Sequence, residues 1–344
     1  MTGPVYHLAL REHYTGAGAH FEVRRGWSLP AHFGDADGEY GMLRRRAVLF
    51  DRSHHSRFVV SGTDAGVVLG EVFGSPAGEL EEGRSLRAVS LRDGLIDDLV
   101  LVSRTGGISY IVVGEPERRF VTYERLKQAV RANFDASIDD RTESTCLFAL
   151  AGPESGAIAA RHLGEGLPSR VRFLQNSAFE AHGFRSLAIR AADTGDDGFL
   201  LMLAPAVAQH LVGEMASDAP MAGECAFEIG RVEACVPAFD PDLTPGISPA
   251  EADLESLLDA PGGSRRWLLS AVIIDGEKPV VSGAPVVEEG RNAGEMRSSV
   301  YSPGLRATIG LALLDPALAT PGTQLSLPGR GLTVAAKPLH RRRA

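Results

Sequence analysis

The segment Gly94–Val102 constrains the fold of this chain most, because it joins a turn, two carboxylates and a run of branched apolar residues. The run Leu99–Val102 predicts a buried strand, and Gly94 predicts the turn before it. Aspartate is common in turns, so Asp97 and Asp98 have a purely structural explanation. A carboxylate at the mouth of an apolar strand is also partly desolvated, which raises its pKa and suits it to handling a proton or a cation. The segment alone is compatible with both explanations.

The composition bounds the class of protein. The 344 residues suffice for two or three domains, and 44% hydrophobic with 23% charged residues is typical of a soluble globular chain. A formal net charge of −9 argues against nucleic acid as the main partner, since that binding needs a basic surface. We find no signal peptide and no apolar run long enough for a bilayer, so we expect a cytoplasmic protein without a membrane partner. Cys146, Cys225 and Cys235 form no CxxC pair and are expected to be small core residues in a reducing compartment.

Residues up to about 135 alternate predicted strands with predicted helices, as in an α+β layer. A loop at Ser53–Ser56 leads into a strand, and Thr63-Asp64-Ala65 predicts the start of a helix that runs towards Phe73. A further strand is predicted at Ser109–Gly114. The clearest helix is predicted over Glu117–Asn133, with an apolar face made of Phe120, Tyr123, Leu126 and Val130.

The second half contains further predicted strands and helices, followed by a different kind of unit. Strands are predicted at Cys146–Leu150, Phe184–Ile189 and Gly198–Leu203, and a helix at Pro205–Met215 begins with proline. Residues 237–263 have the Pro, Gly and Asp content of a connector. The short strands predicted beyond it indicate a small all-β unit: Arg266–Ile274, Ala284–Val287, Arg297–Val300, Thr308–Leu314 and Gln324–Leu327.

Eight short sequence words, in order along nearly the whole chain, resemble the T protein of the glycine cleavage system (aminomethyltransferase) and its folate-dependent relatives. They are Gly26-Trp27-Ser28-Leu29-Pro30, Leu49-Phe50-Asp51 with Ser53-His54, Gly62 with Asp64-Ala65, Gly94–Leu99, Leu150–Pro153, Thr194–Phe199, Ala222-Gly223 leading to Arg231–Ala234, and Ser298-Ser299 with Ser302-Pro303.

The resemblance implies a three-domain cloverleaf of α+β type around a central channel. It implies a folate-binding region of two interwoven subdomains at 1–240, a connector at 241–265 and a C-terminal β-barrel at 266–344. Tetrahydrofolate is the expected cofactor, and a carrier protein is a possible partner beside a small-molecule substrate. The resemblance places the second aspartate of the pair, Asp98, beside the one-carbon unit, where a carboxylate can stabilise a cation or orient a nitrogen.

Three positions depart from the family pattern in ways that bear on the cofactor. Leu200 stands where the family has the glutamate that grips the pterin, Asp193 replaces a tyrosine, and Gly114 replaces an asparagine. A carboxylate is the natural bidentate partner of an aminopyrimidine edge, so Leu200 removes a contact. Asp193 or Asp196 is an alternative source of that carboxylate. We therefore expect folate binding to be weak or altered.

Two histidines precede a predicted strand. The run Ser53-His54-His55 is similar to folate-dependent demethylases of aryl methyl ethers, in which a histidine could act as an acid for a leaving oxygen. A metal site is the poorer interpretation, because no further ligand motif lies nearby. Both rings could equally be packed in the loop.

Arg231 and Glu233 lie on either side of Val232 and are expected to point the same way on a strand. The family comparison favours a structural or folate-tail arginine at Arg231, and the alternative is a surface ion pair of little energy. Residues 234–236 do not reproduce the Lys-Gly-Cys motif of the iron–sulfur-assembly branch of the superfamily.

The leading hypothesis is therefore a tetrahydrofolate-dependent transferase or demethylase that moves an aminomethyl, methylene or methyl unit from a small amine or methoxy substrate. Two alternatives remain. One is a binding or assembly protein that has kept the fold and lost folate chemistry, and the other is an enzyme recruited to a different small-molecule reaction with Asp98 retained.

Overall fold

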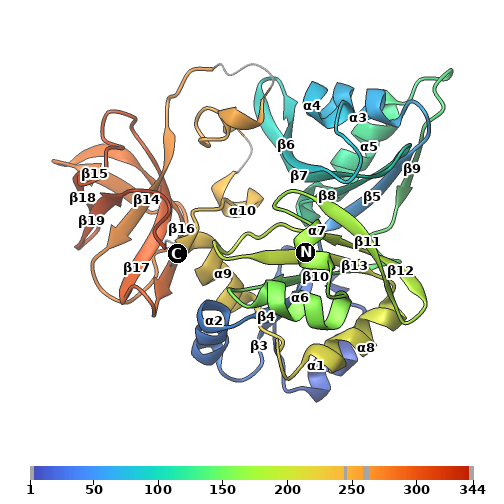
Figure 1. Ribbon diagram of the computed structural model, residues 1–344. Helices are drawn as coiled ribbons and strands as arrows, with labels where there is room; N and C mark the ends of the chain where they lie inside the picture. Colours follow the sequence, from blue (N-terminus) through green and yellow to red (C-terminus); the bar gives the residue numbers. More distant parts are fainter. Residues whose placement is uncertain (1–3, 244–245, 259–262, 341–344) are drawn as a thin grey trace. The chain divides into compact units, whose positions relative to one another are not determined.

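A computed structural model describes residues 4–243, 246–258 and 263–340, which form two compact units. The first unit contains residues up to Ser90, Asp98–Ala192 and Asp196–Phe227. The second contains Leu91–Asp97, Asp193–Gly195 and the chain from Glu228 onwards. Figure 1 colours the chain along its sequence.

The first unit begins with a small three-stranded sheet in the order β1-β3-β2. Its strands are β1 (Tyr6–His7), β2 (His20–Arg24) and β3 (Trp27–His32). Arg25 and Gly26 connect β2 to β3 with φ angles of 53° and 76°. Two consecutive residues with positive φ are typical of the tight hairpin turn whose twist matches that of the strands, and glycine accepts this conformation without strain.

A five-stranded sheet in the order β6-β7-β8-β5-β9 holds the segment with the paired aspartates. Its strands are β5 (Ser56–Ser61), β6 (Ser85–Arg92), β7 (Leu95–Gly106), β8 (Ser109–Gly114) and β9 (Ser137–Asp140). The branched residues on one face, among them Val100, Val102 and Val112, pack with residues of helices α3 (Ala65–Phe73), α4 (Ser75–Gly78) and α5 (Arg119–Ala129).

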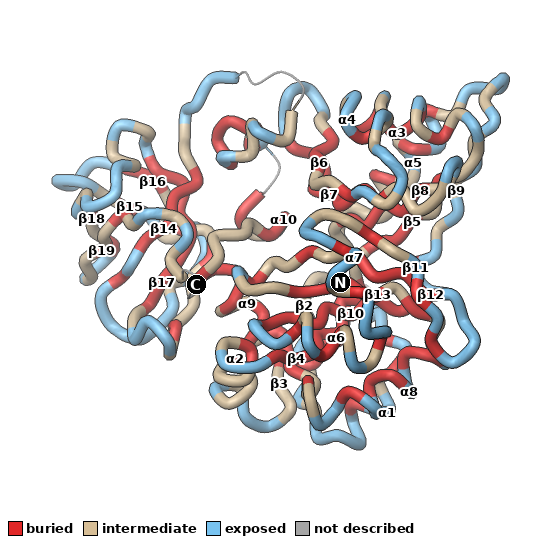
Figure 2. The backbone as a smooth tube through the Cα atoms, viewed as in Figure 1, coloured by how far each residue is buried: buried red, intermediate tan, exposed pale blue. Residues whose placement is uncertain are grey.

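A second five-stranded sheet has the order β11-β12-β13-β10-β4. Its strands are β4 (Val48–Asp51), β10 (Cys146–Ala151), β11 (Asn176–Ala181), β12 (Phe184–Ile189) and β13 (Gly198–Leu203). One face forms the largest core with helices α1 (Arg11–Gly16), α6 (Ser155–Leu163), α7 (Leu167–Arg170) and α8 (Pro205–Met215). Figure 2 shows buried residues concentrated along these central strands. Further regular elements are helix α2 (Ala36–Arg45), a 3₁₀ turn (Pro116–Arg118) and helix α9 (Glu224–Glu233), whose residues from Glu228 belong to the second unit.

The second unit contains a closed barrel in the order β14-β17-β16-β15-β18-β19. The strands are β14 (Leu268–Ile274), β15 (Pro285–Glu288), β16 (Arg291–Ser302), β17 (Ala307–Leu314), β18 (Gln324–Leu327) and β19 (Arg330–Ala335). Apolar residues from all six strands form its interior. The predicted α+β class with a C-terminal β-barrel is confirmed, although β19 was not predicted. Before the barrel, the second unit carries a short helix, α10 (Phe239–Asp242), and a 3₁₀ turn (Glu255–Leu257).

Several elements match the sequence-based expectation residue for residue, and one differs in kind. Strands β8, β12 and β13 and helix α8 have the predicted bounds. Arg231–Glu233 was predicted on a strand and instead ends helix α9, so that prediction is wrong. Among the residues that the structure describes, no helix is both long and apolar enough to cross a bilayer.

Candidate functional site

Asp98 lies near the start of β7, on the helix-covered face of its sheet. Side chains alternate along a strand, so Asp98 shares a face with Val100 and Val102, which belong to the core under the helices. Its side chain is 0% exposed. The strand of branched residues thus carries a carboxylate into the edge of an apolar core.

Both oxygens of the Asp98 carboxyl accept hydrogen bonds from the chain. Oδ2 accepts from the Thr122 hydroxyl on α5 at 2.5 Å, and Oδ1 accepts from the amides of Leu99 at 2.8 Å and Glu115 at 3.3 Å. Burial raises the pKa of Asp98 to about 7, although these three hydrogen bonds oppose the rise by favouring the charged form. Asp98 therefore exchanges its proton near neutral pH.

Asp97 has a different environment. Strand alternation directs its side chain to the other face, and its Oδ2 lies 3.4 Å from the guanidinium of the exposed Arg92. The two aspartates are thus distinguished by their partners, a solvent-exposed cation for Asp97 and internal donors for Asp98.

The backbone of Gly114 is packed closely against Asp98. Gly114 pairs with Ser56 across β8 and β5, and a Cβ at position 114 would lie 2.9 Å from both Asp98 Oδ2 and Ser56 Oγ. Contacts that short require a neighbour to move. The asparagine that the family has here therefore does not fit while Asp98 keeps its present position.

The loop before β5 carries the two histidines. His54 is 1% exposed, and in the described residues neither of its ring nitrogens has a hydrogen-bond partner. The His55 ring lies 4.6 Å from that of His54, with Nδ1 3.2 Å from the Gly114 carbonyl oxygen and Nε2 2.8 Å from Arg52 Nη2. Burial, followed by the positive charge of Arg52, lowers the pKa of both rings well below the usual value. Both are neutral at neutral pH.

The positive charges of Arg25 and Arg52 act on these rings, and each pairs with a carboxylate from another segment that sequence analysis did not identify. Arg52 pairs with Glu224 of α9 at 2.6 Å, and Arg25 of the β2–β3 turn pairs with Glu117 at 2.8 Å. Burial raises the pKa of Glu115 to about 8, partly offset by Arg25. The available sequence signals were the Arg25-Gly26 hairpin turn and the acidic residues directly after β8.

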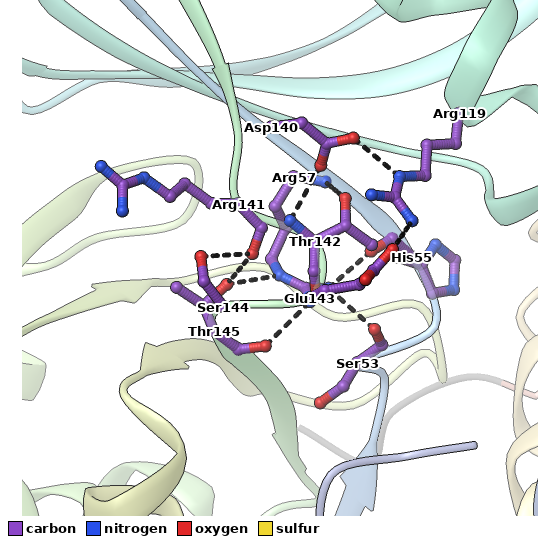
Figure 3. Close-up of polar contacts among 10 residues, drawn as sticks. All are labelled: Ser53, His55, Arg57, Arg119, Asp140, Arg141, Thr142, Glu143, Ser144 and Thr145. Atoms are coloured by element: carbon purple, nitrogen blue, oxygen red, sulfur yellow. Dashed lines mark hydrogen bonds and ion pairs between the residues drawn. The ribbon is translucent and has the colours of Figure 1, made fainter. Parts of the chain in front are cut away.

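Arg57 donates hydrogen bonds to the backbone of the histidine loop (Figure 3). Its side chain is fully buried and donates to the carbonyl oxygens of Ser53 at 3.1 Å and His55 at 2.5 Å. It also donates to the carbonyl oxygens of Thr142 and Thr145 and to the Thr145 hydroxyl. A single cation thereby ties the histidine loop to the segment after β9. Nearby, Arg119 pairs with Asp140 and Glu143, as Figure 3 also shows.

The positions expected to hold a pterin offer few polar groups. Leu200 is buried in β13 between Ala149 and Ile189 on the neighbouring strands. Asp196, considered as a replacement carboxylate, is already paired with Arg44 at 2.6 Å. Asp193 is half-buried in the second unit. The structure thus commits Asp196 to an internal ion pair.

Arg231 belongs to a buried network within the second unit. It donates to Glu228 at 2.9 Å, to Asp242 at 2.7 Å and to Ser298 of β16 at 2.8 Å. Glu233 accepts from the Ser302 hydroxyl. Arg231 is 3% exposed, so the alternative of a surface ion pair is wrong. All three guanidinium nitrogens are used within the chain, as expected for a structural arginine.

The three cysteines were predicted to be small core residues. Cys146 is in the core as predicted, but Cys225 and Cys235 are only half-buried, so that prediction is wrong for two of the three. Burial raises the pKa of each thiol, which disfavours the nucleophilic thiolate. No group of three histidine, cysteine or acidic side chains in the described ranges could hold a metal ion.

Comparison with known proteins agrees with this architecture. Residues 10–260 match the family model of the GCVT N-terminal domain, and residues 266–342 match that of the glycine cleavage T-protein C-terminal barrel domain. An aminomethyltransferase of Streptomyces coelicolor is 28% identical over 92% of this chain and 91% of the relative. One of Saccharopolyspora erythraea is 29% identical, covering 97% and 98%. The crystal structure of glycine cleavage system aminomethyltransferase T from Bartonella henselae matches the fold with a TM-score of 0.89 at 22% identity, over 98% of this chain and 99% of that chain.

Proposed function

Because this chain belongs to the glycine cleavage T-protein family, we propose that it is a transferase that moves a one-carbon unit from a small amine or methoxy substrate. The resemblance seen in the sequence is confirmed by the family models, which match most of the chain. The observation that carries the proposal is the buried carboxyl of Asp98, whose pKa of about 7 lets it change charge at neutral pH.

Asp98 acts in this proposal as an electrostatic group. Its oxygens are occupied by Thr122 and by backbone amides, so its effect on the substrate is exerted through space. A charge in a site from which water is excluded acts more strongly than one in solvent. When ionised, Asp98 stabilises positive charge that develops on a substrate nitrogen in the transition state. When protonated, it loses this effect.

Tetrahydrofolate is the cofactor that we propose for the family chemistry, in which it would accept the one-carbon unit. The residues at the pterin positions do not fit that ring well. Leu200 offers no hydrogen bond, Asp196 is held by Arg44, and Gly114 has no room for a polar side chain beside Asp98. An unpaired buried polar group costs about 1 to 3 kcal/mol, and about 1.4 kcal/mol is tenfold in affinity. We therefore propose binding weaker by orders of magnitude than a site with these contacts would give.

Calorimetry with tetrahydrofolate tests both parts of the proposal. We expect weak binding by the unmodified protein and at least about tenfold tighter binding by Leu200→Glu, because the carboxylate restores a bidentate partner. Leu200→Met is the matched control, which keeps the volume without adding a polar group. Tight binding by the unmodified protein with no gain in Leu200→Glu would show that the pocket has been rebuilt with other contacts.

A second candidate function is a protein that keeps this fold without folate chemistry, acting in binding or assembly or on another small molecule. The apolar Leu200 at the pterin position favours it. A turnover assay with an amine or methoxy substrate distinguishes the candidates, because transfer that requires tetrahydrofolate supports the first and tetrahydrofolate-independent turnover supports a recruited enzyme. No turnover together with no folate binding supports the binding protein.

A further inference from the structure

A pocket of about 540 Å³ lies within the first unit, between the β7–β8 hairpin and strands β12 and β13. Neither the proposed chemistry nor the family comparison uses it. Its volume is within the range of small-molecule sites. Ser109 and Ile111 border it from β8, and Leu187 and Met202 border it from β12 and β13. Leu187 and Met202 pair directly across the two strands, so their side chains lie on one face.

Arg185 supplies the pocket with an exposed positive charge that is held in no ion pair among the described residues. It lies two residues before Leu187 on β12 and so shares its face. Within the described part of the chain, Arg185 makes no hydrogen bond or ion pair, and Glu180, opposite it on β11, is not close enough to form one. None of the residues that line the pocket is an aspartate or a glutamate. The exposed guanidinium therefore has its five N–H donors available to solvent or to a ligand.

The hydroxyl groups of the pocket add donors in the same region. Thr105 donates its hydroxyl hydrogen to the carbonyl oxygen of Ser109 at 3.2 Å and approaches its hydroxyl at 3.4 Å. The Ser109 hydroxyl hydrogen remains available. The pocket thus combines a cation and a hydroxyl donor with an apolar wall, in a protein whose net charge of −9 repels anions elsewhere.

We propose that this pocket binds a small organic anion in which a carboxylate or phosphate group is attached to an apolar body. The anionic group pairs with Arg185, and the apolar body lies against Ile111, Leu187 and Met202. The charged end of the site lies away from the pterin position, whereas Met202 at its apolar end is two residues from Leu200 on the same face of β13. Leu200 pairs with Ile189, which is four residues from Arg185 along β12, or about 13 Å at the rise of a strand. The proposal is independent of the proposed function.

Methyl NMR of the protein labelled at its methionines tests the proposal, because Met202 lines the pocket. The probes are benzoate, phenyl phosphate, the neutral isostere benzamide, and acetate. We expect benzoate or phenyl phosphate at millimolar concentration to shift the Met202 methyl signal, with benzamide and acetate at least about tenfold weaker. The signal is assigned by its loss in Met202→Leu. Saturating tetrahydrofolate should leave this binding unchanged.

Variants locate the charge that recognises the ligand. Arg185→Gln should weaken binding of the anion about tenfold or more, because it removes a charge-assisted pair. Arg172→Gln removes an exposed arginine outside the pocket and should have no effect. Glu180→Gln should strengthen binding, and Ala178→Phe should block it by filling the pocket. Four outcomes would overturn the proposal. They are a Met202 signal that does not move, benzamide binding as tight as that of benzoate, equal weakening of anion binding by Arg172→Gln, and displacement of the anion by tetrahydrofolate.

Discussion

The hydroxyl of Thr122 donates to the carboxylate of Asp98 across 2.5 Å, which joins helix α5 to strand β7. Thr122 is itself 1% exposed, so the bond lies at the edge of a dry core. A hydrogen bond of this kind favours the ionised carboxylate, whereas burial favours the protonated one. The balance between the two sets the pKa of Asp98 at about 7.

Asp98→Asn should separate catalysis from folding. An asparagine can accept from the amides of Leu99 and Glu115 with Oδ1 and donate to Thr122 with its nitrogen, so the fold should persist. Turnover should fall about 10²–10³-fold, the range for a lost electrostatic stabiliser. Asp97→Asn is the matched control and should cost much less. A similar loss of turnover in both variants, or an unfolded Asp98→Asn protein, would contradict the assignment.

The same variant should change how stability depends on pH. The pKa of Asp98 is about 7 in the folded state and about 4 in the unfolded chain. Between these values the folded state binds a proton that the unfolded state does not, so the contribution of Asp98 to stability decreases as pH rises through this window. Asparagine lacks this dependence. We therefore expect the free energy of unfolding of Asp98→Asn, measured with urea, to rise relative to that of the unmodified protein. The rise should be on the order of 1 kcal/mol per pH unit from about pH 4 to 7. A constant difference would show that Asp98 is already ionised in the folded state.

Thr122→Val should move the pH dependence of the reaction. Because the Thr122 hydroxyl favours the ionised form, its removal should raise the pKa of Asp98 further. The rate limb that reports Asp98 should shift to higher pH, with little change in the maximal rate above it. Thr122→Ser keeps the hydroxyl and should restore the original profile. Identical pH profiles for the valine and serine variants would show that the Thr122 hydrogen bond does not influence the pKa of Asp98.

His54→Gln and His55→Gln test the proton-donating role suggested by the sequence. That role predicts a rate limb with an apparent pKa near that of imidazole, roughly 6 to 7. Burial and Arg52 lower the pKa of both rings well below that range, so we expect a limb near pH 7 to survive in both variants and to report Asp98 instead. Loss of the limb in one histidine variant would restore the acid role to that ring. The measurement is the pH profile of kcat/KM.

Regular elements were predictable where a local signal was strong. Proline in the first turn predicted the start of helix α8, and continuous apolar runs predicted strands β8 and β13. Helix α5 was predicted to bury Phe120, which is 66% exposed. The buried positions of α5 are Thr122, Leu126 and Ala129. The prediction therefore missed Thr122, a polar residue on the buried face of the helix.

The surroundings of the site were harder to predict, because they are assembled from distant segments. Asp98 was singled out as a candidate because its neighbours along the chain mark it. Arg52 and Glu224 are 172 positions apart, and no local pattern relates them. Arg231 was assigned to a strand from a four-residue word, whereas the helix that contains it begins at Glu224. Long-range pairs of this kind depend on the packing of the whole unit.

Arg57→Met should destabilise the protein strongly without removing any group from the proposed chemistry. Arg57 donates to the carbonyl oxygens of Ser53, His55, Thr142 and Thr145, and methionine would remove this donor from two buried and two partly buried oxygens. Each orphaned acceptor costs about 1 to 3 kcal/mol, so we expect a loss of about 3 kcal/mol or more in the free energy of unfolding.

Arg141→Met is the control for that loss. Arg141 is half-exposed and pairs with Asp139 at 2.6 Å, so its removal should change stability by about 1 kcal/mol or less. Urea unfolding of both variants gives the comparison. Since Arg57 holds the backbone of the histidine loop, the signals of the His54 and His55 rings in NMR should also shift in Arg57→Met and stay unchanged in Arg141→Met. Equal stability of the two variants would show that water replaces the guanidinium donors, and that the loop keeps its conformation without them.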